Sequence, residues 1–115
     1  MNKNEFVPVE LARAQERLNQ AERIVELRTA ELEVHFSNDP EFGKQIVELA
    51  KTNTEGFKSL KDGKYIIGTI KRQFPQRCMS MFQVKALNYL IGALIRKNIA
   101  EGNVWDLEEE YLIEG

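Results

Sequence analysis

Apolar side chains recur at helical spacing between residues 79 and 102, and this stretch is the richest in the sequence. One face carries five large aliphatic residues, namely Val84, Leu87, Ile91, Leu94 and Ile95. Alanines and further aliphatic residues widen this face most of the way round. A helix that is apolar over so much of its surface is normally buried. The pattern therefore predicts a buried helix at 81–100 around which the rest of the chain packs.

Local signals place both ends of this helix. Ser80 and Gln83 have the spacing of a capping box, in which each side chain bonds the other residue's backbone N–H. At the other end, Gly102 suits the position just after a helix. Asn103 can cap a short C-terminal amphipathic segment, so we expect the core helix to end before residue 102 and a separate segment to follow.

A second helical pattern covers residues 8–36, where no glycine or proline follows Pro8 until Pro40. Apolar residues repeat every seven positions, with alanines at the intervening positions. This seam consists of Leu11, Ala14, Leu18, Ala21, Val25 and Leu32. Small residues on one side let a partner helix approach closely. Three interpretations remain open: the long arm of an intramolecular bundle, the seam of a homodimer, and a docking helix for another protein.

The sequence Ser37-Asn38-Asp39-Pro40 separates this helix from the next one. Asp39 suits the N-cap and Pro40 the first helical position. The stripe that follows fades near Asn53. A short turn between two amphipathic helices is typical of an antiparallel pair, so the sequence predicts a mainly α fold, an antiparallel helical bundle with a long N-terminal helix.

Residues 57–71 fit two structures. Asp62-Gly63 is a strong signal for a two-residue turn, and the residues after it favour strands. Ile66, Ile70 and Phe74, however, keep helical spacing. We expect a small β-hairpin at 57–71, with a helix as the alternative.

The segment LeuLysAspGlyLysTyrIleIleGlyThrIleLys (60–71) resembles the first hairpin of Sm-like RNA-binding barrels, which have a Leu, an Asp-Gly turn and a Gly-Thr pair at this spacing. The resemblance covers only this segment, and the residues after it are helical in pattern. It implies similar hairpin chemistry, and we assign no family from it.

Composition limits the class of protein. The chain has 115 residues, of which 43% are hydrophobic and 30% charged, as expected for one globular domain spanning 1–115. Its richest apolar run is interrupted by Asn88, Arg96 and Lys97, the N-terminal residues lack a secretory signal core, and Cys78 is the single cysteine. We therefore expect a soluble, cytoplasmic protein without a membrane partner.

Charge is unevenly distributed although the net charge is only −2. Residues 64–97 contain seven Lys and Arg residues and no acid, whereas residues 98–115 contain six acids and no base. The basic stretch 58–77 mixes cations with aromatic residues, a composition that binds phosphates and stacks bases. Its candidate partner-binding residues are Lys58, Lys61, Lys64, Tyr65, Lys71, Arg72 and Arg77. The same charges would also suit electrostatic pairing with a protein partner, or with the acidic residues of 98–115 in the same chain.

Chemistry of other kinds has little basis in the sequence. A nucleophile and base could only be Cys78 and His35, which lie in different elements without a recognisable motif. Glu31 and His35 are four residues apart, but no second histidine completes a metal site. We expect no catalytic residue, metal or cofactor.

These patterns predict a small non-enzymatic interaction or regulatory protein that binds a larger macromolecule through a charged surface. An inhibitor of the kind encoded by phages and mobile elements would fit this description. A protein is the expected partner, with a homodimer as a further hypothesis. The alternative is a nucleic-acid-binding accessory protein that uses the basic stretch 58–77.

Overall fold

The computed structural model describes residues 8–114, with side chains as far as Tyr111. The N-terminal residues that we interpreted as lacking a secretory signal lie mostly outside this range. The described chain forms four α-helices and a 3₁₀ helix: α1 (Val9–His35), α2 (Pro40–Asn53), η2 (Leu60–Tyr65), α3 (Ile66–Gln73) and α4 (Met81–Glu114). The predicted mainly α fold is confirmed.

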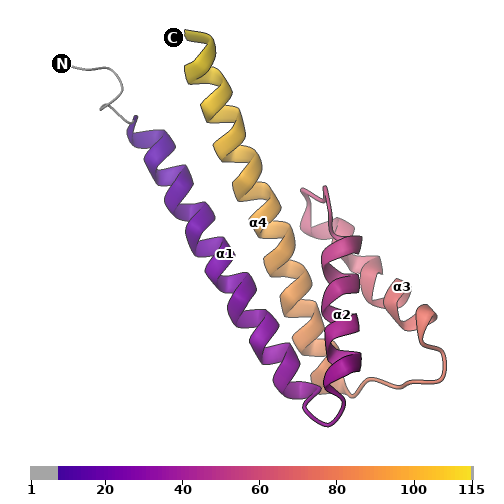
Figure 1. Ribbon diagram of the computed structural model, residues 1–115. Coiled ribbons are helices and arrows are strands. Elements are labelled where there is room, and N and C mark those ends of the chain that lie inside the picture. Colours follow the sequence, from indigo (N-terminus) through magenta and orange to yellow (C-terminus); the bar gives the residue numbers. More distant parts are fainter. Residues whose placement is uncertain (1–7, 115) are drawn as a thin grey trace.

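Helices α1 and α4 lie side by side and antiparallel along most of their length, and the whole molecule is elongated, at 63 × 23 × 18 Å (Figure 1). The seam of α1 packs against α4 of the same chain: Ala14 and Leu32 are buried, and Leu18 is half-buried. We call the part of this pair that extends beyond α2, η2 and α3, residues 9–24 and 99–111, the stem, and we call the direction away from those elements outward. The seam is thus used within the chain, as the intramolecular hypothesis expects.

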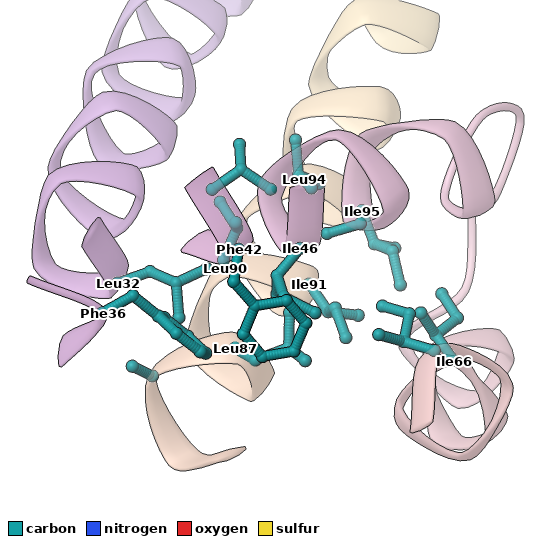
Figure 2. Close-up of a cluster of buried hydrophobic side chains, with 14 residues drawn as sticks. Leu32, Phe36, Phe42, Ile46, Ile66, Leu87, Leu90, Ile91, Leu94 and Ile95 are labelled. Carbon is teal, nitrogen blue, oxygen red and sulfur yellow. The ribbon is translucent and has the colours of Figure 1, made fainter. Parts of the chain in front are cut away.

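The other elements pack on the remaining half of the helix pair (Figure 1). We call this half, together with α2, η2 and α3, the head. Side chains from the end of α1, from α2, α3 and the first half of α4 meet in one apolar cluster (Figure 2). Leu87, Leu90 and Ile46 are completely buried there. The stretch that the sequence singles out is therefore the centre of the core.

Caps and one asparagine fix the chain between these helices. Asp39 accepts a hydrogen bond from the backbone N–H of Phe42, 3.3 Å away, at the start of α2. Ser80 and Gln83 form the predicted capping box, with N···O distances of 2.8 and 3.1 Å. Asn98 donates to the carbonyl oxygens of Thr54 and Phe57, at 2.8 and 3.1 Å, and so ties the segment after α2 to α4.

The expected β-hairpin at 57–71 is wrong, because residues 60–73 form η2 and α3 and no strand occurs in residues 8–114. The helical spacing decides the outcome: Ile66 and Ile70 both enter the core, where they are 4% and 0% exposed. A two-residue hairpin turn would need positive φ angles, but Gly56 is the only described residue with one. The hydroxyl of Thr69 donates to the carbonyl of Tyr65, one helical turn earlier.

The expected end of the core helix before Gly102 is also wrong. Helix α4 continues through Gly102 and Asn103 to Glu114 without a break. Val104, which is 5% exposed, is buried beyond that glycine, so the continuation of α4 also buries apolar surface. The acidic C-terminal segment is therefore the outer end of α4, and within the described chain it points away from the head. None of the described helices is both long and apolar enough to cross a membrane.

Candidate interaction surface

The predicted basic stretch does not form one patch. The guanidinium of Arg77 lies 2.8 Å from the carboxylate of Asp39 and 4.4 Å from the ring centre of Phe42, so it is engaged within the head. Lys58 lies beside Gly102 of α4, in a hollow that it shares with Trp105 and acidic residues of the stem. These two cations are separated from the rest of the stretch.

The remaining members of the stretch are exposed on η2 and α3. They are Lys61, Lys64, Tyr65, Lys71 and Arg72. The ammonium of Lys64 lies 5.8 Å from the ring centre of Tyr65. Arg72 lies 3.4 Å from the hydroxyl oxygen of Thr69 in the same helix. Their placement on helices, and not on a hairpin, sets the direction in which each is presented.

A close approach at Gly63 brings η2 against α4. A Cβ atom at this position would lie 2.8 Å from Cδ1 of Ile95 and 3.0 Å from Cγ2 of Ile91. Only a residue without a side chain lets the backbone of η2 come so near. The glycine that suggested a turn in the sequence instead docks η2 onto α4, and it thereby carries Lys64 to the surface of that helix.

The result is a hollow between η2 and α4, of about 420 Å³, which we call the cationic hollow. Lys64 from η2 and Lys85 and Arg96 from α4 line it, and none of its lining residues is acidic. Among the described residues none of these three cations takes part in an ion pair. Three unpaired cations around one concavity favour a negatively charged occupant.

The lining of the cationic hollow is not purely polar. Ile91 and Ile95 contribute buried apolar surface. Leu60, 48% exposed, and Tyr89, 50% exposed, also line it. An occupant can therefore make apolar as well as charged contacts.

Sequence reasoning missed Lys85 and Arg96 as site residues. They are distant from stretch 58–77 along the chain, and only folding brings them beside Lys64. The signal that could have found them is the acid-free run 64–97, which contains both. Their spacing of eleven residues, about three helical turns, places them on one side of α4.

A second concavity runs between α1 and α4 with a volume of about 870 Å³. It begins in the stem and extends into the head as far as Arg28 and Tyr89, and we call it the stem groove. Alanines from both helices line it: Ala14, Ala21, Ala93 and Ala100. Arg28 stacks over the ring of Tyr89 at 4.9 Å and pairs with Glu31 at 2.9 Å. Tyr89 and Arg96 line both the stem groove and the cationic hollow, so the two concavities are neighbours.

Other candidate chemistries can be placed in the same structure. Cys78 is exposed in the segment between α3 and α4, and His35 is exposed at the end of α1. Within the described residues, no group of three or more His, Cys, Asp or Glu side chains could hold a metal ion. Glu108, Glu109 and Glu110 are exposed on the outer end of α4.

Comparison with known proteins adds no family assignment. The chain matches no family model, no curated protein and no solved structure. Function must therefore be inferred from the surface itself.

Proposed function

We propose that this chain is a non-enzymatic interaction protein that binds an acidic segment of a larger partner protein at the cationic hollow. The observation that supports this most directly is the convergence of Lys64, Lys85 and Arg96, from two separate elements, on one concavity without an acidic lining residue. The chain would act by occupying a surface of its partner, which is a regulatory or inhibitory mode of action.

Apolar surface in the hollow favours a protein partner. Interface centres are enriched in tyrosine and arginine, and binding energy concentrates where such side chains surround an apolar pocket. Tyr89 and Arg96 border the hollow, and Ile91 and Ile95 contribute to its lining. A peptide with an aliphatic side chain flanked by carboxylates would fill the hollow and pair with the cations.

Nucleic acid is the second candidate, and one observation favours it. Tyr65 is 71% exposed and lies beside Lys64, while Lys61 and Lys71 are exposed on the same two elements. An exposed aromatic ring among lysines can stack a base while the ammonium groups contact phosphates. This candidate uses η2 and α3, whereas the protein-binding proposal depends on Lys85 and Arg96.

Fluorescence anisotropy with two labelled probes separates the candidates. One probe is a helical peptide with glutamate and leucine four residues apart, and the other is a mixed-sequence single-stranded oligonucleotide. The test variant is Lys64→Ala/Lys85→Ala/Arg96→Ala. The control is Arg23→Ala/Lys44→Ala/Lys51→Ala, which removes the same charge from exposed positions outside the hollow.

The proposal expects the peptide to bind the wild-type chain and the control alike, and the test variant about tenfold or more weakly. Equal losses in both variants would show only a general charge effect and would overturn the site. Tighter binding of the oligonucleotide, lost in Lys61→Ala/Lys71→Ala, would establish the nucleic-acid function in its place. Absence of peptide binding even at low salt would reject the protein-binding proposal.

A further inference from the structure

The face of the helix pair that contains the stem groove has no partner in the described chain. Every residue that lines this groove comes from α1 or α4, so α2, η2 and α3 leave it uncovered. Two large side chains that line it remain exposed after α1 and α4 have packed, Ile24 at 46% and Tyr89 at 50%. Exposed apolar and aromatic residues along a concave surface are typical of an interaction site.

Small side chains make the groove suitable for another helix. Ala14 and Ala93 form its floor, where they are 7% and 3% exposed, and Ala21 and Ala100 are half-buried in its lining. Alanines allow helix backbones to approach closely, and two further helices would complete a four-helix bundle. From Glu10 to Arg28 the groove follows about five turns of α1, or roughly 27 Å.

Charge changes sign along the α4 side of this groove. Asp106 lies at the outer end of this side and Arg96 near its middle, while on the α1 side Glu10 lies at the outer end and Arg28 at the inner end. The stripe of α4 that lines the groove continues outward to Glu110 and inward to Lys85, which are both exposed. Arg13 and Arg17 are the exceptions, since they lie on the outer half of α1.

We infer that the occupant is a second copy of this chain, packed antiparallel through the stem groove about a two-fold axis perpendicular to the stem. Such an axis lays α4 against the partner's α4 with reversed direction. The acidic outer end of each α4, with Asp106 and Glu110, then meets the basic inner half of the other, which runs from Lys85 to Arg96. A two-fold interface must be self-complementary in this way.

The size of the face agrees with a weak dimer. Two helices side by side are roughly 20 Å wide, which over roughly 27 Å gives about 500 Å² from each copy. The total of about 1,000 Å² lies at the lower limit for a specific interface. Self-association should therefore depend on protein concentration and weaken as salt is added.

This inference rests on the proposed function, because the second copy would cover Lys85 and Arg96 of the cationic hollow. The dimer would hold the binding face closed, and an acidic partner would have to displace the acidic end of the other copy. Dimerisation and partner binding are then mutually exclusive, which gives the protein a concentration-dependent control over its own site.

Reciprocal charge reversal tests the arrangement. Sedimentation velocity is recorded from low to several hundred micromolar protein for three variants. These are Lys85→Glu/Arg96→Glu, Asp106→Lys/Glu110→Lys, and the control Lys44→Glu/Lys51→Glu, whose positions lie outside the groove. Each of the first two variants should weaken self-association by about tenfold or more, because like charges then oppose each other. The control should dimerise as the wild type does.

Mixing supplies the decisive result. An equimolar mixture of the first two variants should form a heterodimer, because every reversed face then meets a reversed partner. A mixture that stays monomeric, or a wild-type chain that is monomeric at all these concentrations, would overturn the inference. Circular dichroism of each variant checks that helix content is unchanged, so that loss of folding is not mistaken for loss of the dimer.

The glutamate–leucine peptide distinguishes the two proposals. If both hold, Asp106→Lys/Glu110→Lys should bind the peptide more tightly than the wild type, because its site is no longer covered. Peptide binding by a strictly monomeric wild-type chain would reject the dimer and keep the proposed function. A dimer that follows the charge-reversal pattern, but with no peptide binding in any variant, would keep the antiparallel arrangement and reject the acidic partner.

Discussion

The head and the stem are built from the same two helices but are held together differently. In the head α4 contacts α1, α2, η2 and α3, and fourteen buried residues form the apolar cluster there. In the described stem α1 is the only helix beside α4, with Lys58 reaching Gly102 from the segment after α2, and the buried apolar residues there are Ala14 and Val104. One helix thus passes from a packed core into a two-helix arm.

This difference separates stability from the capacity to bind. Free energy of folding comes mainly from burial of apolar area, so it is concentrated in the head. The described stem leaves apolar and charged surface uncovered because no third helix packs along it. A two-helix arm that buries so little is expected to open more often than the head, and further packing on it would be stabilising.

The largest contrast should come from removing equivalent leucine side chains in the two regions. Leu90→Ala in the head should lower the free energy of unfolding by about 2–5 kcal/mol, because this side chain is completely buried and leaves a cavity. Leu18→Ala in the stem, where the side chain is half-buried, should cost about 1 kcal/mol. Urea denaturation of both variants measures the difference. Equal costs would show that the stem is packed as tightly as the head.

Sequence reasoning succeeds where one physical signal dominates. The capping box at Ser80 and Gln83 and the cap at Asp39 are local, so a few residues suffice to predict them. The buried helix is equally clear, because its apolar surface has no alternative to burial. The predicted long N-terminal helix likewise follows from an uninterrupted pattern.

Sequence reasoning fails where a glycine can have more than one structural role. Gly63 resembles a turn residue, yet its role is to let η2 approach Ile91 and Ile95, which lie 28 and 32 residues later in the sequence. Spacing along the chain contains no information about such a contact. For the same reason Lys85 and Arg96 could not be joined to Lys64 before the fold was known.

The second prediction concerns this contact in the head. Gly63→Ala should destabilise the protein by about 1–3 kcal/mol, because the added methyl group would lie 2.8 Å from Cδ1 of Ile95 and the core must shift. Relative to the wild-type protein, amide hydrogen exchange in Gly63→Ala should accelerate more in η2 than in α2. Gly68→Ala is the matched control, since a Cβ there meets nothing within 4 Å, and it should not be destabilising. Equal losses in both variants would place η2 away from α4.

The third and smallest effect is expected in the stem. Gly102→Ala should raise the free energy of unfolding by about 0.5–1 kcal/mol, because alanine stabilises the interior of a helix relative to glycine. The added Cβ would lie 3.1 Å from Nζ of Lys58, the flexible end of a side chain, which can move aside. If the helix instead ended at this glycine with a positive φ, as the sequence pattern suggested, the same substitution would be destabilising. The sign of the change in urea denaturation therefore decides whether α4 is continuous, and with it whether the acidic end stands far enough from the head to meet another chain.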